Sequence, residues 1–279
     1  MQELIRPDGT TINYNVVGNG EPILMLAPGG ISSAESEWDE YFVDPRVLAN
    51  NFTVITMDQR HAGASRAPLT PFSHDDVFAD QVAVLNVLGI QSASIIAADF
   101  YCASALKFAC DAPARTRSTI LIEPMGLDDS NTMDDFYAVF NDTIRRARAD
   151  GLEGVISAAG KNPIFSQNTE AGPWCQRLHD QPGFAEAIRS LGRETYIALL
   201  VDFRDGAFPN DKRYFSVNEL EVCNTSVPLL IIPGNDLLHP AGLVKRLQKD
   251  TENARISDAS RNDSFELLNE IRSFLDQCS

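Results

Sequence analysis

The stretch from Ser94 to Ala109 constrains the fold of this chain more than any other part of its sequence. It begins as a short apolar run, breaks at the carboxylate of Asp99 and resumes with residues that favour a helix. Read as strand, sharp turn and helix, it predicts a nucleophile elbow, in which the residue at the tip stands above the carboxyl edge of a parallel sheet. The backbone N–H groups after such a tip point at a developing negative charge. Most elbows of this kind carry Ser or Cys between glycines, whereas here Asp99 stands between alanine and aromatic neighbours.

Buried strands and helices alternate on both sides of this stretch. A continuous apolar run, typical of a strand covered on both faces, occurs at residues 22–27, and further buried strands are predicted at 52–57, 118–122 and 227–232. A helix is predicted over residues 75–88, where apolar side chains recur largely at helical spacing. The alternation predicts an α/β fold with a doubly wound, mostly parallel sheet whose ligand lies at the carboxyl ends of the strands. Residues 10–17 show the alternating pattern of a strand and have a turn signal on each side, which predicts an opening hairpin.

The pattern changes to amphipathic helices without strands from about residue 127 to residue 218. We predict that this segment is a helical lid, inserted into a core domain made of residues 1–126 and 219–279. Lid aromatic residues more often pack a lid onto the body than touch a substrate, yet their number favours an apolar ligand. Trp174 is the lid residue that we expect to contact the substrate. A helix at 243–249, a short strand near 254–257 and a closing helix at 265–275 complete the core.

Composition and charge narrow the function. Asp and Glu number 39 against 23 Lys and Arg, so the net charge of -16 repels nucleic acid and anionic membranes. The five cysteines are scattered, with no C-x-x-C motif and no Cys/His ligand spacing. This usage favours a reduced, cytoplasmic setting without a metal site.

The chain shows no targeting or cofactor motif. It does not open on a basic segment followed by an apolar one, and no run approaches the roughly 18 apolar residues that span a bilayer. Neither the dinucleotide fingerprint nor the P-loop motif occurs. We therefore expect a soluble, unprocessed protein that needs no cofactor, acts on a small molecule and is a monomer or a homodimer.

Four segments, taken in order, resemble the α/β-hydrolase superfamily. They are the glycine-rich loop at 26–30, the arginine loop at 57–65, the elbow with its helix, and residues 232–236, where a strand ends in an acid. Each match alone is weak, but four matches in the right order and spacing are strong evidence together. The resemblance covers nearly the whole chain. The resemblance implies an α/β-hydrolase fold with a helical insertion, and a site built from a nucleophile, a histidine and an acid.

The resemblance also implies roles for particular residues. Asp99 takes the nucleophile position and Asp236 the position of the acid. The oxyanion hole would be formed by the backbone N–H of Phe100 with that of Gly29 or Gly30.

Two departures from the family pattern bear on the chemistry. The histidine expected between the last strand and the last helix is missing, since residues 258–264 contain none. Tyr101 stands where the family has a glycine, so it must either relax the turn or project into the pocket as a binding group. His239, three residues after Asp236, is the best candidate for a replacement base, and the alternative is that it caps the helix beginning near Pro240.

Two further residues have ordinary structural expectations. His61 lies in the loop after a buried strand, and we expect it at the surface. Cys102 begins the elbow helix, where the helix N-terminus would favour a thiolate, but a position facing the core is the commoner case.

Three roles for Asp99 stay open: covalent nucleophile, general acid or base, and a structural residue in a protein that has lost catalysis. Because the usual histidine and serine are absent, we expect a cofactor-independent enzyme that performs a non-hydrolytic acid/base reaction on a small, largely apolar molecule. Such a lyase, isomerase or cyclase step would use Asp99 as the proton-transfer centre, assisted by His239 and Asp236. The alternatives are a hydrolase with Asp99 as covalent nucleophile, acting on an epoxide, a halide, a lactone or an ester, and a ligand-binding protein without catalysis.

Overall fold

The computed structural model describes residues 1–259 and 263–278, so residues 260–262 of the loop without histidine lie outside the described residues. An eight-stranded sheet forms its centre, with the strand order β1-β2-β4-β3-β5-β6-β7-β8. The strands are β1 (Gln2–Ile5), β2 (Thr11–Val17), β3 (Glu21–Leu26), β4 (Phe52–Met57), β5 (Ala93–Ala98), β6 (Thr116–Ile122), β7 (Leu229–Ile232) and β8 (Ala254–Ile256).

The sheet confirms the predicted mixture of an antiparallel edge and a parallel centre. β1 and β2 pair antiparallel as the predicted hairpin, and β2 pairs antiparallel with β4. All remaining pairs, from β4 to β8, are parallel. Burial follows this division, because β2 alternates between buried and partly exposed residues whereas β5 is buried throughout.

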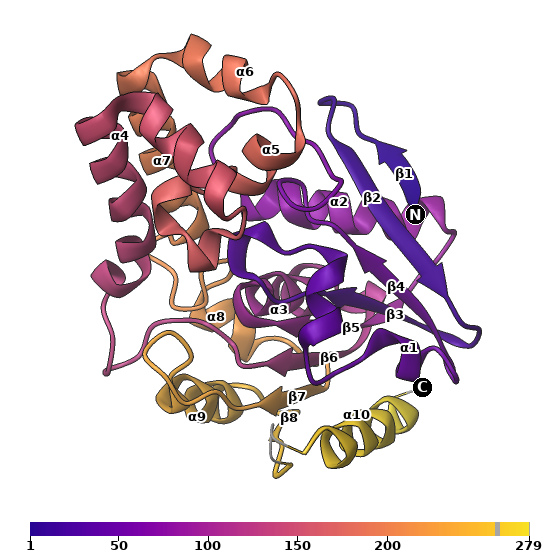
Figure 1. Cartoon of the computed structure of the whole chain (residues 1–279). Helices are drawn as coiled ribbons and strands as arrows, with labels where there is room; N and C mark the ends of the chain where they lie inside the picture. The colour runs from indigo at the N-terminus through magenta and orange to yellow at the C-terminus, as the bar shows by residue number, and fades with distance from the viewer. Residues whose placement is uncertain (260–262, 279) are drawn as a thin grey trace.

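Besides the sheet, the described residues form ten α-helices (Figure 1). They are α1 (Pro45–Leu48), α2 (His74–Val87), α3 (Cys102–Asp111), α4 (Met133–Lys161), α5 (Cys175–Asp180), α6 (Phe184–Leu191), α7 (Arg193–Ala207), α8 (Glu219–Cys223), α9 (Ala241–Asp250) and α10 (Ser264–Gln277). Buried side chains form two clusters, one on each face of the sheet: α2, α3 and α9 contribute to the first, and α1 and α10 to the second. The doubly wound arrangement is therefore confirmed.

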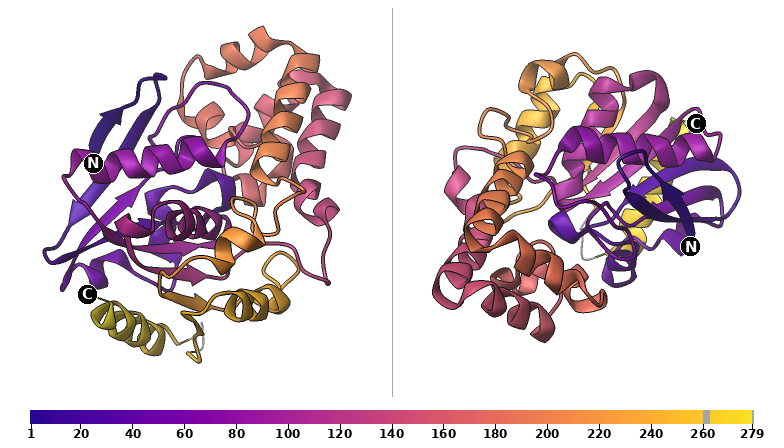
Figure 2. Two further views of the ribbon diagram at one scale, coloured as in Figure 1. Left: turned by 180° about the vertical axis from the view of Figure 1, so that it is seen from behind. Right: turned by 90° about the horizontal axis from the view of Figure 1, so that it is seen from above.

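Helices α4 to α7 gather beyond one side of the sheet, at the end of the molecule opposite α10 (Figures 1 and 2). Residues 127–218, all of which the structure describes, form helices and turns without a strand. The long α4 begins with a capping box between Thr132 and Asp135 and is interrupted at Gly151, whose φ is 69°. The helical character of this insertion matches the prediction, while its boundaries as a separate lid domain stay a prediction.

No helix in the described part of the chain is both long enough and apolar enough to cross a membrane.

Candidate active site

Asp99 stands at the tip of the elbow, as the sequence pattern predicts. It follows β5 directly and opens a short 3-10 turn (Asp99–Tyr101) that leads into α3. Its backbone has a φ of 57°, a conformation that costs a residue with a side chain about 1–3 kcal/mol. Ala97 and Ala98, both fully buried, keep the end of the strand free of bulk. This backbone conformation places the carboxylate of Asp99 at the carboxyl edge of the sheet.

His239 reaches the same place from the loop after β7. Asp236 accepts hydrogen bonds from the backbone N–H groups of Leu238 and His239, both at 2.9 Å, which folds the loop back on itself. Gly234 permits this turn, because a Cβ there would lie 2.5 Å from the Cβ of His239. The N-cap of α9 is Pro240 and makes no side-chain capping bond, so the structure does not support a capping role for His239.

Asp99, His239 and Asp236 form one continuous chain of contacts. His239 Nε2 lies 3.0 Å from Asp99 Oδ1, and His239 Nδ1 lies 2.8 Å from Asp236 Oδ1. Asp99 and His239 are largely shielded, with side chains 24% and 17% exposed, whereas Asp236 is 59% exposed. A nucleophile, a base and an acid in this order are the elements of covalent catalysis.

The glycine-rich loop holds the second carboxylate oxygen of Asp99. The backbone N–H of Gly30 donates to Asp99 Oδ2 at 2.9 Å. Gly29 and Gly30 have φ values of 101° and 59°, which glycine adopts without strain. A predicted oxyanion-hole donor is therefore already in contact with the carboxylate of Asp99 itself.

These residues open onto a cavity of about 250 Å³. Its lining is mainly apolar, and its side chains come from both the core and the helical insertion. The lining residues are Gly29, Gly30, Ile31, Asp99, Phe100, Met125, Val139, Phe165, Ser166, Phe208, Leu238 and His239. Sequence reasoning missed Ile31 and the apolar members from Met125 onward, because an amphipathic pattern does not tell which apolar side chain faces a cavity and which faces the core.

The structure corrects the expected substrate contacts of Tyr101 and Trp174, since neither lines this cavity. Tyr101 is 1% exposed, stands edge-on to Phe100, and its hydroxyl lies 3.5 Å from the carbonyl oxygen of Ile31. Trp174 is fully buried inside the helical insertion against Phe203. Both rings bury too much apolar surface in the core to be available at the cavity wall.

His61 is also placed differently from the prediction. It is only 4% exposed and stands edge-on to Phe203 of α7, with the ring centroids 5.3 Å apart. Burial, with the charges of Arg60 and Arg177, lowers the pKa of His61 to about 3. Cys102 faces the core as expected, and burial raises the pKa of its thiol well above the ordinary value.

Glu123 and Tyr41 are site neighbours that the sequence did not single out. Glu123 follows β6, the strand between those that carry Asp99 and His239, and its backbone φ is 51°. The Tyr41 hydroxyl donates to Glu123 Oε2 at 3.3 Å. A Cβ on Gly234 would lie 3.4 Å from the Cβ of Glu123, so this carboxylate lies close to the loop of His239. The signal that reveals it is the left-handed backbone, which is visible only in three dimensions.

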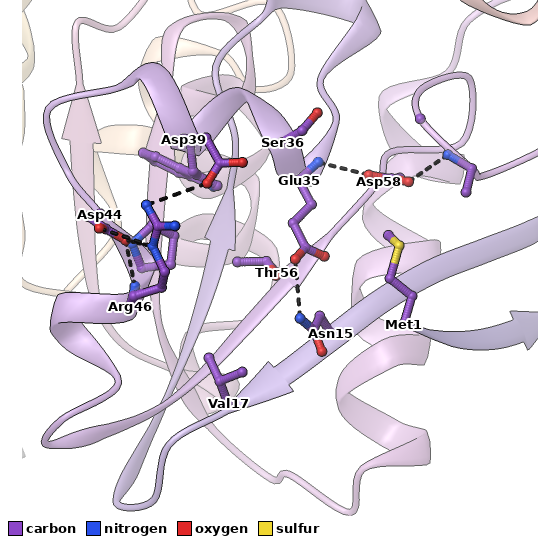
Figure 3. Close-up of a pocket in the computed structure, with 14 residues that line it drawn as sticks. Met1, Asn15, Val17, Glu35, Ser36, Asp39, Asp44, Arg46, Thr56 and Asp58 are labelled. Atoms are coloured by element: carbon purple, nitrogen blue, oxygen red, sulfur yellow. Dashed lines mark hydrogen bonds and ion pairs between the residues drawn. The ribbon is translucent and has the colours of Figure 1, made fainter. Parts of the chain in front are cut away.

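A larger hollow of about 510 Å³ lies apart from this site, beside the 3-10 helix Glu35–Glu40, and neither Asp99 nor His239 lines it (Figure 3). Asp58 of the arginine loop accepts the backbone N–H groups of Glu35 at 2.8 Å and of Ala64 at 2.6 Å. Figure 3 shows Asp58 beside Glu35. Asp58 therefore links the arginine loop to the 3-10 helix Glu35–Glu40. Among the described residues, no group of three or more His, Cys, Asp or Glu side chains is arranged to hold a metal ion.

The charges around His239 favour its protonated form. Burial alone would lower the pKa of His239, but the hydrogen bond to Asp99 and the negative charges of Asp99 and Asp236 raise it to about 9. Partial burial acts to raise the pKa of Asp236, but the backbone N–H and the charge of His239 lower it overall. The resting site thus contains an imidazolium between two carboxylates.

We expect the titration of His239 by NMR to have its midpoint near pH 9. The raised pKa stabilises the fold fully below the unfolded value of 6.5, and this stabilisation is lost as the pH rises through about 9. Unfolding free energies from pH 6 to pH 10 should therefore fall for the wild type and stay flatter for His239→Gln. Equal slopes for the two proteins, or a midpoint near 6.5, would show that the two carboxylates do not stabilise the imidazolium.

A sequence model described as the alpha/beta hydrolase fold matches residues 22–255. The chain belongs to the alpha/beta hydrolase fold family. The predicted family is thereby confirmed.

Curated relatives of this α/β-hydrolase match part of its length. A 2-hydroxy-6-oxo-6-phenylhexa-2,4-dienoate hydrolase of Delftia acidovorans is 33% identical over 122 residues, which are 43% of this chain and 42% of the relative. The rhodomycin D methylesterase DnrP of Streptomyces peucetius is 35% identical over 104 residues, which are 35% of this chain and 34% of the relative. The chain thus matches about two fifths or less of the length of these relatives.

Solved structures resemble the whole fold. An enol-lactonase from Burkholderia xenovorans LB400 has a TM-score of 0.60 and 19% identity, with 97% of each chain covered. A meta-cleavage product hydrolase from Pseudomonas fluorescens IP01 has a TM-score of 0.63 and 17% identity, and covers 100% of this chain and 97% of its own. At this identity the likeness shows the shared fold.

Proposed function

We propose that this chain is a cofactor-independent hydrolase whose Asp99 carboxylate attacks an electrophilic carbon of a small, largely apolar molecule and forms a covalent ester. The observation that carries the proposal is the hydrogen bond of 2.9 Å from the Gly30 N–H to Asp99 Oδ2. In a serine hydrolase the corresponding amide receives an oxygen of the substrate. Here the amide holds an oxygen of the nucleophile, which suits a mechanism in which the enzyme's own ester is later attacked.

The first step forms that ester. Asp99 Oδ1, the oxygen that is not held by Gly30, attacks the substrate carbon, and the bond from this carbon to the leaving group breaks with its electron pair going to the leaving group. The apolar cavity wall holds the apolar part of the substrate against Asp99.

The second step hydrolyses the ester. His239 Nε2, which lies 3.0 Å from Asp99 Oδ1, takes a proton from a water molecule whose oxygen attacks the carboxyl carbon of Asp99. Negative charge develops on Oδ2, which already faces the Gly30 N–H. Collapse of the intermediate passes the proton from His239 to the leaving alkoxide, which departs as the alcohol. The carboxylic acid that remains at Asp99 then gives its proton to His239 Nε2, and this restores the resting carboxylate and imidazolium.

Ester formation itself prepares His239 for the second step. In the resting site both ring nitrogens face carboxylates, and ionised carboxylates only accept hydrogen bonds, so each nitrogen must carry a hydrogen. Esterification removes the negative charge of Asp99, which is one of the causes that raise the pKa of His239. The pKa of His239 therefore falls once the ester exists. Release of the Nε2 proton to a basic leaving group or to solvent then makes the neutral base available at the step that needs it.

The expectation of non-hydrolytic chemistry rests on the absence of the usual serine and of the histidine before the last helix. The distance of 3.0 Å from His239 Nε2 to Asp99 Oδ1 supports His239 as a replacement base, so the loss of the usual histidine no longer favours a lyase, isomerase or cyclase. The curated relatives named above are hydrolases or a methylesterase, which supports hydrolysis as the reaction class.

The cavity supports a small and largely apolar substrate. Its volume of about 250 Å³ and its wall of Phe100, Phe165 and Phe208 suit a compact hydrocarbon group. Among the described residues that line it there is no Arg or Lys, and the imidazolium of His239 is already held by the carboxylates of Asp99 and Asp236, so no cationic side chain remains for the carboxylate of a dienoate. The dienoate substrates named for the curated relatives therefore do not suit this site.

A rapid-quench experiment tests the proposal with two neutral electrophiles, n-butyl bromide and styrene oxide. We expect at least one of them to be hydrolysed, and the peptide that contains Asp99 to carry the mass of the organic group during the first turnover. Hydrolysis without an adduct on this peptide would contradict the nucleophilic role. Thermal stabilisation by both compounds without any turnover would instead identify a ligand-binding protein.

A further inference from the structure

Asn131 connects the start of the helical insertion to the loop that carries His239. Its side chain is buried, with 9% of the residue exposed. Asn131 Nδ2 donates to the carbonyl oxygen of Leu237 at 2.8 Å and to that of Gly126 at 3.0 Å. Asn131 Oδ1 accepts the backbone N–H of Asp128 at 3.0 Å. One side chain thus joins the segment after β6 to the loop after β7.

The network determines which way the amide points. Two carbonyl oxygens lie on the side of Nδ2 and one N–H lies on the side of Oδ1, so the reversed amide would place an acceptor against two acceptors. A buried donor is costly to leave unpaired, and both hydrogens of this amide are in use. The contact is therefore specific to asparagine.

The segment that Asn131 joins is itself tied to the end of the insertion. Leu127 and Arg213 exchange hydrogen bonds, since the Leu127 N–H donates to the Arg213 carbonyl at 3.0 Å and the Arg213 guanidinium donates to the Leu127 carbonyl at 2.7 Å. Both stems of the insertion thus meet beside Asn131. The loop of His239 is therefore anchored to the base of the insertion, where its first and last residues meet, rather than to its outer helices.

We propose that Asn131 is a positioning residue that holds the loop of residues 234–240, and with it His239, against Asp99. The effect on turnover rests on the proposed function, but the positioning itself does not. The contacts between Asp236 and His239 lie within the loop and move with it. The contact between His239 and Asp99 joins two separate segments, so it depends on where the loop is held.

The test compares Asn131→Ala with Asn168→Ala in the full-length chain. Asn168 is a matched control, because its Nδ2 also donates to two carbonyl oxygens, those of Ala158 and Asn162, both at 2.8 Å, but within the helical insertion. The readout is the titration of His239 followed by NMR, which requires no substrate. The charged groups near His239 are Asp99, Asp236 and, beside Gly234, Glu123, and both variants retain all three.

In Asn131→Ala we expect the pKa of His239 to fall from about 9 toward its ordinary value of 6.5, because the contact with Asp99 loosens while that with Asp236 stays. Asn168→Ala should leave the titration unchanged. With a turned-over probe, Asn131→Ala should lower kcat at least about tenfold with little change in KM, since Asn131 does not line the cavity.

The same titration midpoint in Asn131→Ala and in the wild type would overturn the proposal, whether or not any substrate is found. If Asn131→Ala does not fold, Asn131→Asp takes its place, because it keeps the acceptor for Asp128 and loses both donors. A wild-type kcat in Asn131→Asp would then overturn the proposal. If the wild type forms no ester on Asp99, the proposed function is contradicted. The titration of His239 still tests the positioning, because it requires no substrate.

Discussion

The Asp99→Asn substitution is expected to lower kcat/KM by at least about 10⁴-fold for any substrate that the wild type hydrolyses. The substituted side-chain amide has nearly the same shape as the carboxylate and still offers an oxygen to the N–H of Gly30. It is not a nucleophile, so no ester forms. Steady-state kinetics and mass analysis of the peptide around position 99 measure the two effects together.

Asp75→Asn serves as the control for the loss of one negative charge. Asp75 is 85% exposed at the start of α2, where it pairs with Lys107, and lies outside the cavity lining. This variant should keep wild-type kinetics. An Asp99→Asn protein that retains more than about a tenth of wild-type activity would exclude Asp99 both as nucleophile and as proton-transfer centre.

Replacing His239 with Gln is expected to stop turnover after the first step. Alkylation of Asp99 by n-butyl bromide needs no proton from His239, whereas hydrolysis of the resulting ester needs a base. We therefore expect kcat to fall at least about 10³-fold and the butyl ester to accumulate toward one equivalent per chain. The mass of the intact protein measures the ester directly.

His179→Gln is the matched control, because His179 is exposed in α5 and its nearest carboxylate, that of Asp180, is 4.0 Å away. It should turn over the probe as the wild type does and should accumulate no ester. Full turnover by His239→Gln would show that another group activates water. Loss of turnover without any ester would indicate that His239 is needed for the first step.

Much of the fold was predictable, because its signals are local. The strands from β3 to β7 are rich in apolar residues because parallel central strands are buried on both faces, and this pattern is visible without coordinates. The elbow was equally visible, as a strand that breaks at a carboxylate before a helix. The boundaries of α2 and α9 fell within about two residues of the expected ones.

The candidate site was only partly predictable, because its decisive contacts are non-local. Asp99 and His239 are 140 residues apart, and their contact depends on the turn at Gly234 and on the hydrogen bonds that Asp236 accepts from the loop backbone. The wrong expectation that Tyr101 and Trp174 contact the substrate has a similar cause. A large aromatic residue beside a pocket satisfies the same sequence pattern as one in the core, and burial alone decides between them.

A single turnover in water enriched in heavy oxygen distinguishes attack by Asp99 on the substrate from direct attack by water. We expect the label to enter the carboxylate of Asp99, because water attacks the carboxyl carbon of the enzyme ester, while the first product carries an unlabelled oxygen from Asp99. Peptide mass spectrometry locates the label. Product that carries the label from the first turnover, with Asp99 unlabelled, would contradict the account and show that water attacks the substrate itself.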